Sequence, residues 1–209
     1  MRALVTGGAK RIGRGIALAL ADAGCDIVLH YHTSTIEANQ TADEIRAKGV
    51  TCTLARVDLS NPMASQLLMS KATPIDVLIN NAAQFDPSPT ADAMQQLHIN
   101  TLLPIELARS MKAGSVVINL TDVNALHTAS NSYSRSKHEL HLQTKVLAQE
   151  LAPSIRVNDV ALGAVLAPEL SPEGYKHVRI EDTPRGKFPT PKEVADAVLK
   201  LVADQNITG

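Results

Sequence analysis

The chain has 209 residues, of which 44% are hydrophobic and 20% charged, and its formal net charge is −1. This length suits one domain with a sizeable core. The nearly balanced charge gives no indication of a partner such as nucleic acid or an anionic membrane surface. No apolar run reaches the length of a membrane span, and no signal-peptide pattern opens the sequence. Cys25 and Cys52 lie where expected strands begin or run, so we expect reduced thiols and a cytoplasmic location.

A short buried strand is expected at residues 2–5, followed by a glycine-rich turn and a helix with apolar residues at helical spacing. Strand, glycine turn and helix in this order form a cradle for a dinucleotide pyrophosphate. Gly7 lets the chain turn tightly, and Gly13 lets the helix start close to the sheet with its N–H groups free for phosphate. The residues of this turn that we expect to bind a cofactor are Gly7, Lys10, Arg11, Ile12 and Gly13.

Strands and helices alternate along the rest of the chain. Further strands are expected at 27–29, 51–57, 76–80, 115–120 and 155–160. Helices are expected at 35–48, 63–71, about 90–111, 131–151 and, after a capping box at Thr190 and Glu193, through 203, whereas 168–186 show no clear periodicity. This alternation predicts an α/β fold, a Rossmann-like doubly wound parallel sheet with helices on both faces, in a single domain covering residues 1–209.

Tyr133 and Lys137 are four residues apart and therefore share one face of the expected helix. A tyrosine hydroxyl is a useful acid near pH 7 only if its pKa of ~10 is lowered. A neighbouring ammonium group lowers that pKa by stabilising the phenolate. A surface tyrosine beside a solvated lysine has the same spacing, so the pair does not decide the chemistry alone.

Five motifs in chain order resemble the short-chain dehydrogenase/reductase family over nearly the whole sequence. They are Thr6-Gly7 with Gly13, Asp58, Asn80-Asn81-Ala82-Ala83, Asn100, and Tyr133 with Lys137. The resemblance implies a Rossmann fold, a nicotinamide cofactor, hydride transfer to a small molecule and a homo-oligomer. It makes Tyr133 the proton donor, Lys137 the partner of the nicotinamide ribose, and Asn100 the holder of a relay water. It places Asp58 against the adenine, and Asn81 with Ala82 along the cofactor.

Two departures from the general family pattern resemble its pteridine reductase branch, which includes dihydromonapterin reductases. Arg11 replaces the middle glycine of the turn, and Asp122 replaces the serine at the end of the fifth strand. Residues 29–32 and 81–85 also resemble that branch. The resemblance implies a substrate site in which Phe85 stacks on the pterin, Arg11 contacts phosphate and pterin, and Asp122 helps Tyr133 to protonate the ring.

Other interpretations of these residues stay open. Asp122 could instead be a solvated carboxylate at a strand end, Phe85 a loop residue packed on the core, and Arg11 a solvated side chain. One alternative function is reduction of 3-oxoacyl or other carbonyl substrates, for which a serine is better suited than Asp122. Another is a non-catalytic NADP-binding regulator, against which an intact Tyr133, Lys137 and Asn100 argue.

The end of the second strand predicts the choice of cofactor. NAD-specific enzymes usually place an acidic residue there to bind the ribose hydroxyls. This sequence instead offers hydroxyl and basic side chains, with Lys10 and Arg11 across the turn, so we expect NADPH, with His32 and Ser34 among its ligands. His30 and His32 alternate on a strand with no third ligand nearby, so we expect no metal site.

The resemblance also implies a last strand beyond Thr208-Gly209, which this sequence does not contain. Either that strand lies outside this sequence or the protein has lost it. We expect a compact member of the family, in which loss of the strand would weaken the substrate end and the subunit contacts.

Overall fold

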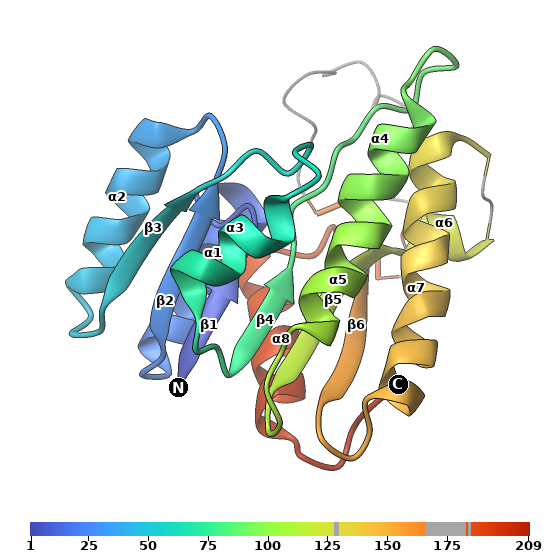
Figure 1. Cartoon of the computed structure of the whole chain (residues 1–209). Helices are drawn as coiled ribbons and strands as arrows, with labels where there is room; N and C mark the ends of the chain where they lie inside the picture. The colour runs from blue at the N-terminus through green and yellow to red at the C-terminus, as the bar shows by residue number, and fades with distance from the viewer. Residues whose placement is uncertain (128–129, 166–182, 184) are drawn as a thin grey trace.

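A computed structural model describes residues 1–127, 130–165, 183 and 185–209. Six strands, each paired in parallel with its neighbours, form one sheet in the order β3-β2-β1-β4-β5-β6 (Figure 1). The strands are β1 (Arg2–Val5), β2 (Asp26–Tyr31), β3 (Cys52–Arg56), β4 (Val77–Asn80), β5 (Val116–Asp122) and β6 (Arg156–Leu162). The predicted fold class, a doubly wound parallel sheet, is confirmed.

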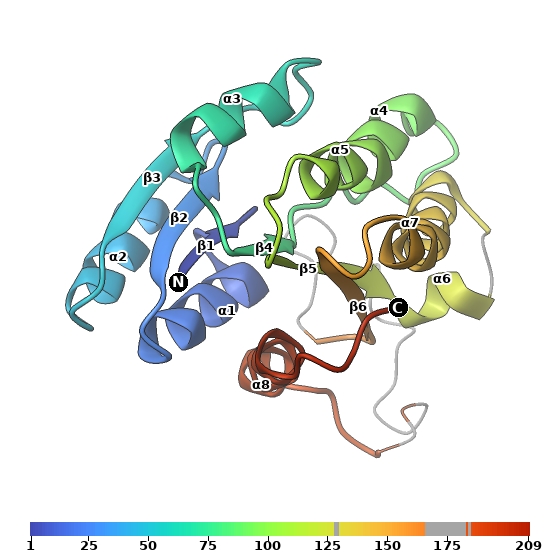
Figure 2. The ribbon, with the colours of Figure 1, turned by 60° about the horizontal axis from the view of Figure 1, so that its bottom comes forward.

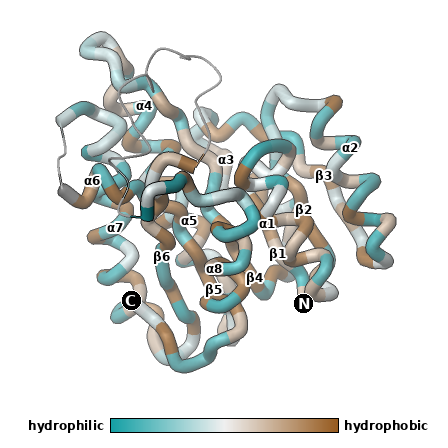
Figure 3. The backbone as a smooth tube through the Cα atoms, turned by 180° about the vertical axis from the view of Figure 1, so that it is seen from behind, coloured by the Kyte–Doolittle hydropathy of each residue, from teal (hydrophilic) through white to brown (hydrophobic). Residues whose placement is uncertain are grey.

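Helices cover both faces of this sheet (Figure 2). One face carries α1 (Arg11–Asp22), α2 (Thr35–Arg46) and α8 (Pro191–Ala203). The other carries α3 (Ala64–Ala72), α5 (Leu103–Arg109) and α7 (Ser132–Glu150). Successive strand residues point to opposite faces, so Ala3 and Val5 pack under the first group of helices and Leu4 under the second. In Figure 3 the hydrophobic colour concentrates along the central strands, whereas the outer helix α2 is largely hydrophilic.

The helix predicted at about 90–111 differs from the observed one. It begins later, as α4 (Ala93–Leu97), because the Asp92 side chain caps it by accepting a hydrogen bond from the Gln95 amide, 3.0 Å away. A wide π turn, η1 (His98–Leu102), then joins α4 to α5. Pro104 explains that turn, because proline has no N–H to donate to the Asn100 carbonyl and its ring would clash with that carbonyl in a regular helix.

Strand β5 also differs from its prediction, because it continues through Asp122 instead of ending at Leu120. Thr121 and Asp122 are paired with Ala161 and Leu162 of β6. A short helix that the sequence analysis missed, α6 (Val123–His127), follows directly. Asp122 therefore stands at the carboxyl end of a strand and at the start of a helix at once.

The other parts of the described chain bear on the predictions as follows. No helix within these residues is long and apolar enough to cross a bilayer. Cys25 and Cys52 are buried and free. The C-terminal residues lie along β6, where the Gly209 amide donates to the Val157 carbonyl over 2.9 Å. Most of the stretch 168–186, for which no periodicity was found, lies outside the described residues.

Candidate active site

The glycine turn after β1 is locked to the carboxyl end of β4. The Thr6 hydroxyl donates to the Ile79 carbonyl and accepts from the amides of Asn81 and Ala82, each 3.0 Å away. The Asn81 side chain returns to the turn and donates to the carbonyl oxygens of Thr6 at 2.8 Å and Gly7 at 3.1 Å. These contacts hold the turn in the crevice where the strand order reverses, which is where doubly wound sheets bind ligands.

Both glycines of the turn are required by its geometry. Gly7 has φ +62°, a backbone conformation that other residues rarely adopt. A Cβ atom on Gly13 would overlap the Gly7 carbonyl oxygen and lie 2.5 Å from Asn81 Nδ2. The first turn of α1 can therefore approach β1 closely only because residue 13 has no side chain.

His30 is a supporting residue that the sequence analysis did not identify. Its buried ring accepts a hydrogen bond at Nδ1 from the Gly7 amide, 3.0 Å away, so Nε2 carries the proton that is donated to the Val57 carbonyl over 3.0 Å. Burial lowers the pKa of His30 to about 4, which keeps the ring neutral. The ring therefore joins the glycine turn to the end of β3, and a histidine one residue before the end of β2 was the available signal.

A cavity of about 650 Å³ lies at the ends of these strands. All the residues expected to bind the cofactor line it, apart from Lys137. They are Gly7, Lys10, Arg11, Ile12, Gly13, His32, Ser34, Asp58, Asn81 and Ala82. Within the described residues no side chain caps the N-terminus of α1, and its first turn holds no acidic residue. A helix N-terminus of this kind favours an anion, so the site fits a dinucleotide phosphate.

Arg11 has φ +56°, a left-handed conformation at the position where the family pattern has glycine. A non-glycine residue held there stores on the order of 1–2 kcal/mol of strain, and such strain gathers at functional sites. Across the cavity, His32 Nε2 lies 3.7 Å from the Asp58 carboxylate. The backbone amide and the hydroxyl of Ser60 both donate to that carboxylate and hold the pKa of Asp58 below its usual value.

A second, smaller cavity of about 180 Å³ shares Ile12, Asn81 and Ala83 with the first. Its wall brings together three of the residues that the sequence analysis expected to be catalytic, Asp122, Tyr133 and Lys137. The two cavities therefore adjoin at these three residues, and the predicted cofactor site lies beside the predicted site of chemistry.

Lys137 is 3% exposed, and its ammonium group donates to the Leu120 carbonyl over 2.8 Å. Burial lowers the pKa of Lys137 to about 8, and the negative charge of Asp122 opposes that effect. The lysine is therefore a cation at neutral pH that loses its charge at a much lower pH than a solvated lysine. This cation lies one helical turn from Tyr133, as its predicted role requires.

Asp122 has a structural role besides its place in the cavity. Its carboxylate accepts a hydrogen bond from the Asn124 amide over 2.8 Å, which is the N-cap contact of α6. Serine and asparagine are also good N-cap residues. A substitution by either can therefore test the carboxylate while the helix stays capped.

The other two predicted residues lie outside the lining of both cavities. Phe85 is 44% exposed, and its ring meets Tyr133 edge to face with the centroids 4.7 Å apart. Asn100 is fully buried, and its amide is bonded to both backbone groups of Gln84 and to the Ser136 hydroxyl. Its assignment to a relay water stays a prediction. Arg11 lines the larger cavity but not the smaller one.

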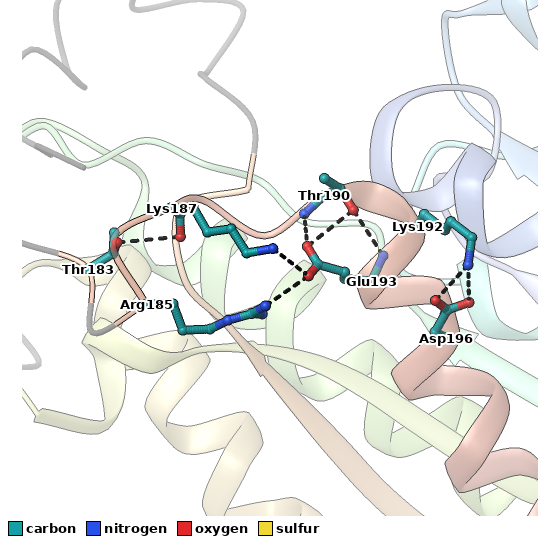
Figure 4. Close-up of polar contacts among 7 residues, drawn as sticks. All are labelled: Thr183, Arg185, Lys187, Thr190, Lys192, Glu193 and Asp196. Atoms are coloured by element: carbon teal, nitrogen blue, oxygen red, sulfur yellow. Dashed lines mark hydrogen bonds and ion pairs between the residues drawn. The ribbon is translucent and has the colours of Figure 1, made fainter. Parts of the chain in front are cut away.

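The predicted capping box at the start of α8 is confirmed and forms a larger cluster (Figure 4). The Glu193 carboxylate accepts from the Thr190 amide at 2.9 Å, Arg185 at 3.1 Å and Lys187 at 3.4 Å. The Thr190 amide first, and then Arg185, hold the pKa of Glu193 to about 2. These contacts attach the segment before α8 to the helix that packs against α1.

Among the described residues, no group of three or more His, Cys, Asp or Glu side chains is placed to hold a metal ion.

Comparisons with known proteins agree with this geometry. Residues 1–176 match the family model described as short chain dehydrogenase. The uncharacterized oxidoreductase YmfI of Bacillus subtilis is 31% identical over 224 residues, which cover 97% of this chain and 91% of YmfI. FolM alternative dihydrofolate reductase 1 from Brucella canis, in complex with NADP, is 29% identical with a TM-score of 0.87, over 99% of this chain and 89% of FolM.

A ketoreductase gives a similar match. The landomycin C-6 ketoreductase LanV, with bound NADP and rabelomycin, is 25% identical with a TM-score of 0.86, over 99% of this chain and 91% of LanV. Both of these solved structures hold NADP, whereas their names describe different substrates. These two structures thus share the cofactor and differ in the substrate that their names describe.

Proposed function

Because the chain belongs to the short-chain dehydrogenase family and is an NADP-dependent oxidoreductase, we propose that it reduces a pterin-type ring. The observation that carries this proposal is a carboxylate, Asp122, in the same small cavity as Tyr133 and Lys137. The similarity to a FolM alternative dihydrofolate reductase supports it.

The chemistry of a pterin accounts for these side chains. NADPH, when bound, supplies the hydride that reduces a C=N bond of the ring. Tyr133 donates the proton that the ring nitrogen needs, and the Lys137 cation favours the phenolate that Tyr133 leaves behind. Asp122 hydrogen-bonds the amidine-like edge of the ring and helps to protonate it, and Phe85, beside Tyr133, offers an aromatic ring for stacking.

Asp122→Ser is the experiment that tests the proposal. The serine keeps α6 capped, so lost activity reports on the carboxylate. A positioned acid or base contributes about 10²–10⁴-fold to rate, and we expect a fall of that order in pterin-dependent NADPH oxidation. An unchanged rate would contradict the assignment of a pterin substrate, and so would a wild-type enzyme that reduces an acetoacetyl thioester but no pterin. Either result would keep the family assignment.

Two further variants separate binding from chemistry. Tyr133→Phe should keep NADPH affinity and lose most turnover, because only the proton source is removed. Phe85→Ala should mainly raise KM for a pterin, through lost stacking of roughly 0.5–1.5 kcal/mol beyond area burial. Near-normal turnover of Tyr133→Phe would make Asp122 the first candidate for the proton donor.

Reduction of a carbonyl substrate is the second candidate function, and the similarity to LanV favours it. A carbonyl reductase should gain from Asp122→Ser, because a hydroxyl can hydrogen-bond a developing alkoxide that a carboxylate repels. The sign of the change therefore distinguishes the two candidates. A cytoplasmic location and a homo-oligomer are further proposals, which fractionation and light scattering test.

A further inference from the structure

Two fully buried amide side chains, Gln96 of α4 and Asn100 of η1, lie four residues apart on one helical face. Gln96 Oε1 accepts from the Asp86 amide at 3.3 Å, and Gln96 Nε2 donates to the Asp86 carbonyl at 3.0 Å. Asn100 makes the same reciprocal pair with Gln84, at 2.8 Å and 3.0 Å. Each amide thus replaces a strand partner, exchanging both bonds with one backbone residue as antiparallel strands do.

Each amide also reaches α7 with its remaining N–H. Gln96 Nε2 donates to the Ser132 hydroxyl at 2.8 Å, and Asn100 Nδ2 donates to the Ser136 hydroxyl at 2.9 Å. The Ser136 hydroxyl in turn donates to the Tyr133 carbonyl at 2.7 Å. Both N–H donors of each amide are therefore used inside the protein.

The residues between these contacts are Phe85 and Tyr133. Phe85 lies between the two backbone residues held by the amides, and Tyr133 lies between the two serines. Their rings meet edge to face, with planes 83° apart. The distance between the predicted proton donor and its aromatic neighbour is thus fixed from both sides by one pair of buried amides.

A buried amide is costly unless its groups are bonded, and an apolar side chain would fill the same space without that cost. A leucine or methionine at 96 would give the core its volume but leave the Asp86 backbone and the Ser132 hydroxyl without this partner. The hydrogen-bonding groups of this network are side-chain amides, hydroxyls and backbone groups, none of which titrates across the working range of pH.

We propose that Gln96 is a positioning residue that sets specificity for flat aromatic substrates, by holding the Phe85 segment in register with Tyr133. This inference rests on the proposed function only in that it treats Phe85 and Tyr133 as the walls of the substrate site. It applies equally to a flat pterin and to a flat aromatic ketone.

Two diketones with the same reacting group test this role, 9,10-phenanthrenequinone, which is flat and aromatic, and diacetyl, which has no ring. In Gln96→Met we expect kcat/KM for the quinone to fall about tenfold, mostly through KM, and kcat/KM for diacetyl to stay within about twofold. Ser132→Ala, which removes one hydrogen-bond acceptor near the start of α7, should give a smaller shift in the same direction.

Thr101→Val is the matched control. The Thr101 hydroxyl is fully buried on the same helical segment and donates to the Ser136 carbonyl over 2.8 Å, away from residues 84–86. We expect this variant to lose stability but to keep the wild-type ratio of the two kcat/KM values. An equal shift in Thr101→Val would show that Gln96 acts only through stability.

Amide hydrogen exchange gives a readout that needs no substrate. In Gln96→Met the Asp86 amide should exchange at least tenfold faster while the Gln84 amide, which Asn100 holds, is unchanged. Unaltered exchange at Asp86, or an unaltered quinone-to-diacetyl ratio, would overturn the proposal. Absence of pterin reduction in the wild type would overturn only the proposed function, because neither the diketone ratio nor the exchange depends on a pterin.

Discussion

Gly13→Ala is the substitution for which the structure gives the sharpest expectation. The new Cβ would overlap the Gly7 carbonyl oxygen and press on Asn81 Nδ2, so either the turn or α1 must move. Overpacking of this kind costs typically 1–3 kcal/mol. The displaced Asn81 side chain would also lose hydrogen bonds to Thr6 and Gly7, each worth about 0.5–1.5 kcal/mol. Alanine recovers about 1 kcal/mol of helix propensity, so we expect a net loss of roughly 1–5 kcal/mol.

Gly15→Ala is a control on the same helix. A Cβ there would first meet Pro191 Cβ at 3.4 Å, which is ordinary contact, so the propensity gain should appear almost alone. Urea unfolding should therefore rank Gly15→Ala above wild type and Gly13→Ala below it. Titration with NADPH should show weaker binding in Gly13→Ala and near-normal binding in Gly15→Ala. Equal stability and equal affinity of the two variants would refute the close approach of α1 to β1.

Three other predictions follow from charges near the site. NADPH should bind at least tenfold more tightly than NADH, since a charge-assisted contact is worth roughly 1.5–3 kcal/mol. Arg11→Ala should reduce this ratio of affinities, and equal affinities of the wild type for NADPH and NADH by titration would contradict the prediction. Because burial lowers the pKa of Lys137 to about 8, the side chain loses its positive charge as pH rises through 8, and kcat/KM should fall there. A kcat/KM that stays constant up to pH 10 would contradict this role of the Lys137 charge. Asp122 and Tyr133 are the titratable neighbours that share its cavity. Burial lowers the pKa of His30 from 6.5 to about 4, so as pH falls the unfolded chain takes up a proton before the folded protein does. The free energy of unfolding should therefore drop by about 3 kcal/mol between pH 6.5 and 4, and His30→Gln should lose this dependence in urea unfolding.

The order and type of the main elements could be predicted from the sequence because each has its own local signal. Strands such as β4 are apolar on both faces, as buried parallel strands are, and α8 opens on a capping box. The break in the helix before Pro104 depends on a missing backbone donor, which hydrophobic periodicity does not register. The continuation of β5 through Asp122 depends on pairing with β6, which lies more than thirty residues further along the chain.

The residues of the cofactor cavity could be predicted because they follow strand ends, and parallel strands bring those ends together. His30 and Gln96 could not, for the opposite reason. Each acts through a partner that only the folded chain brings near, the Gly7 amide in one case and the Asp86 backbone in the other. A buried polar residue has no periodic signature of its own, so its partner must be known before its role is.

The central position of β1 has a consequence for how the protein folds. Its pairing with β2 joins residues about 24 apart, but the bonds from Thr6 to the end of β4 join residues 75 apart in sequence. Closing so long a loop carries an entropic cost that later contacts must offset, and such non-local pairing slows folding. A chain emerging from the ribosome can therefore build β1, α1 and β2 early. It acquires a turn able to hold phosphate only after β4 has been synthesised and docked.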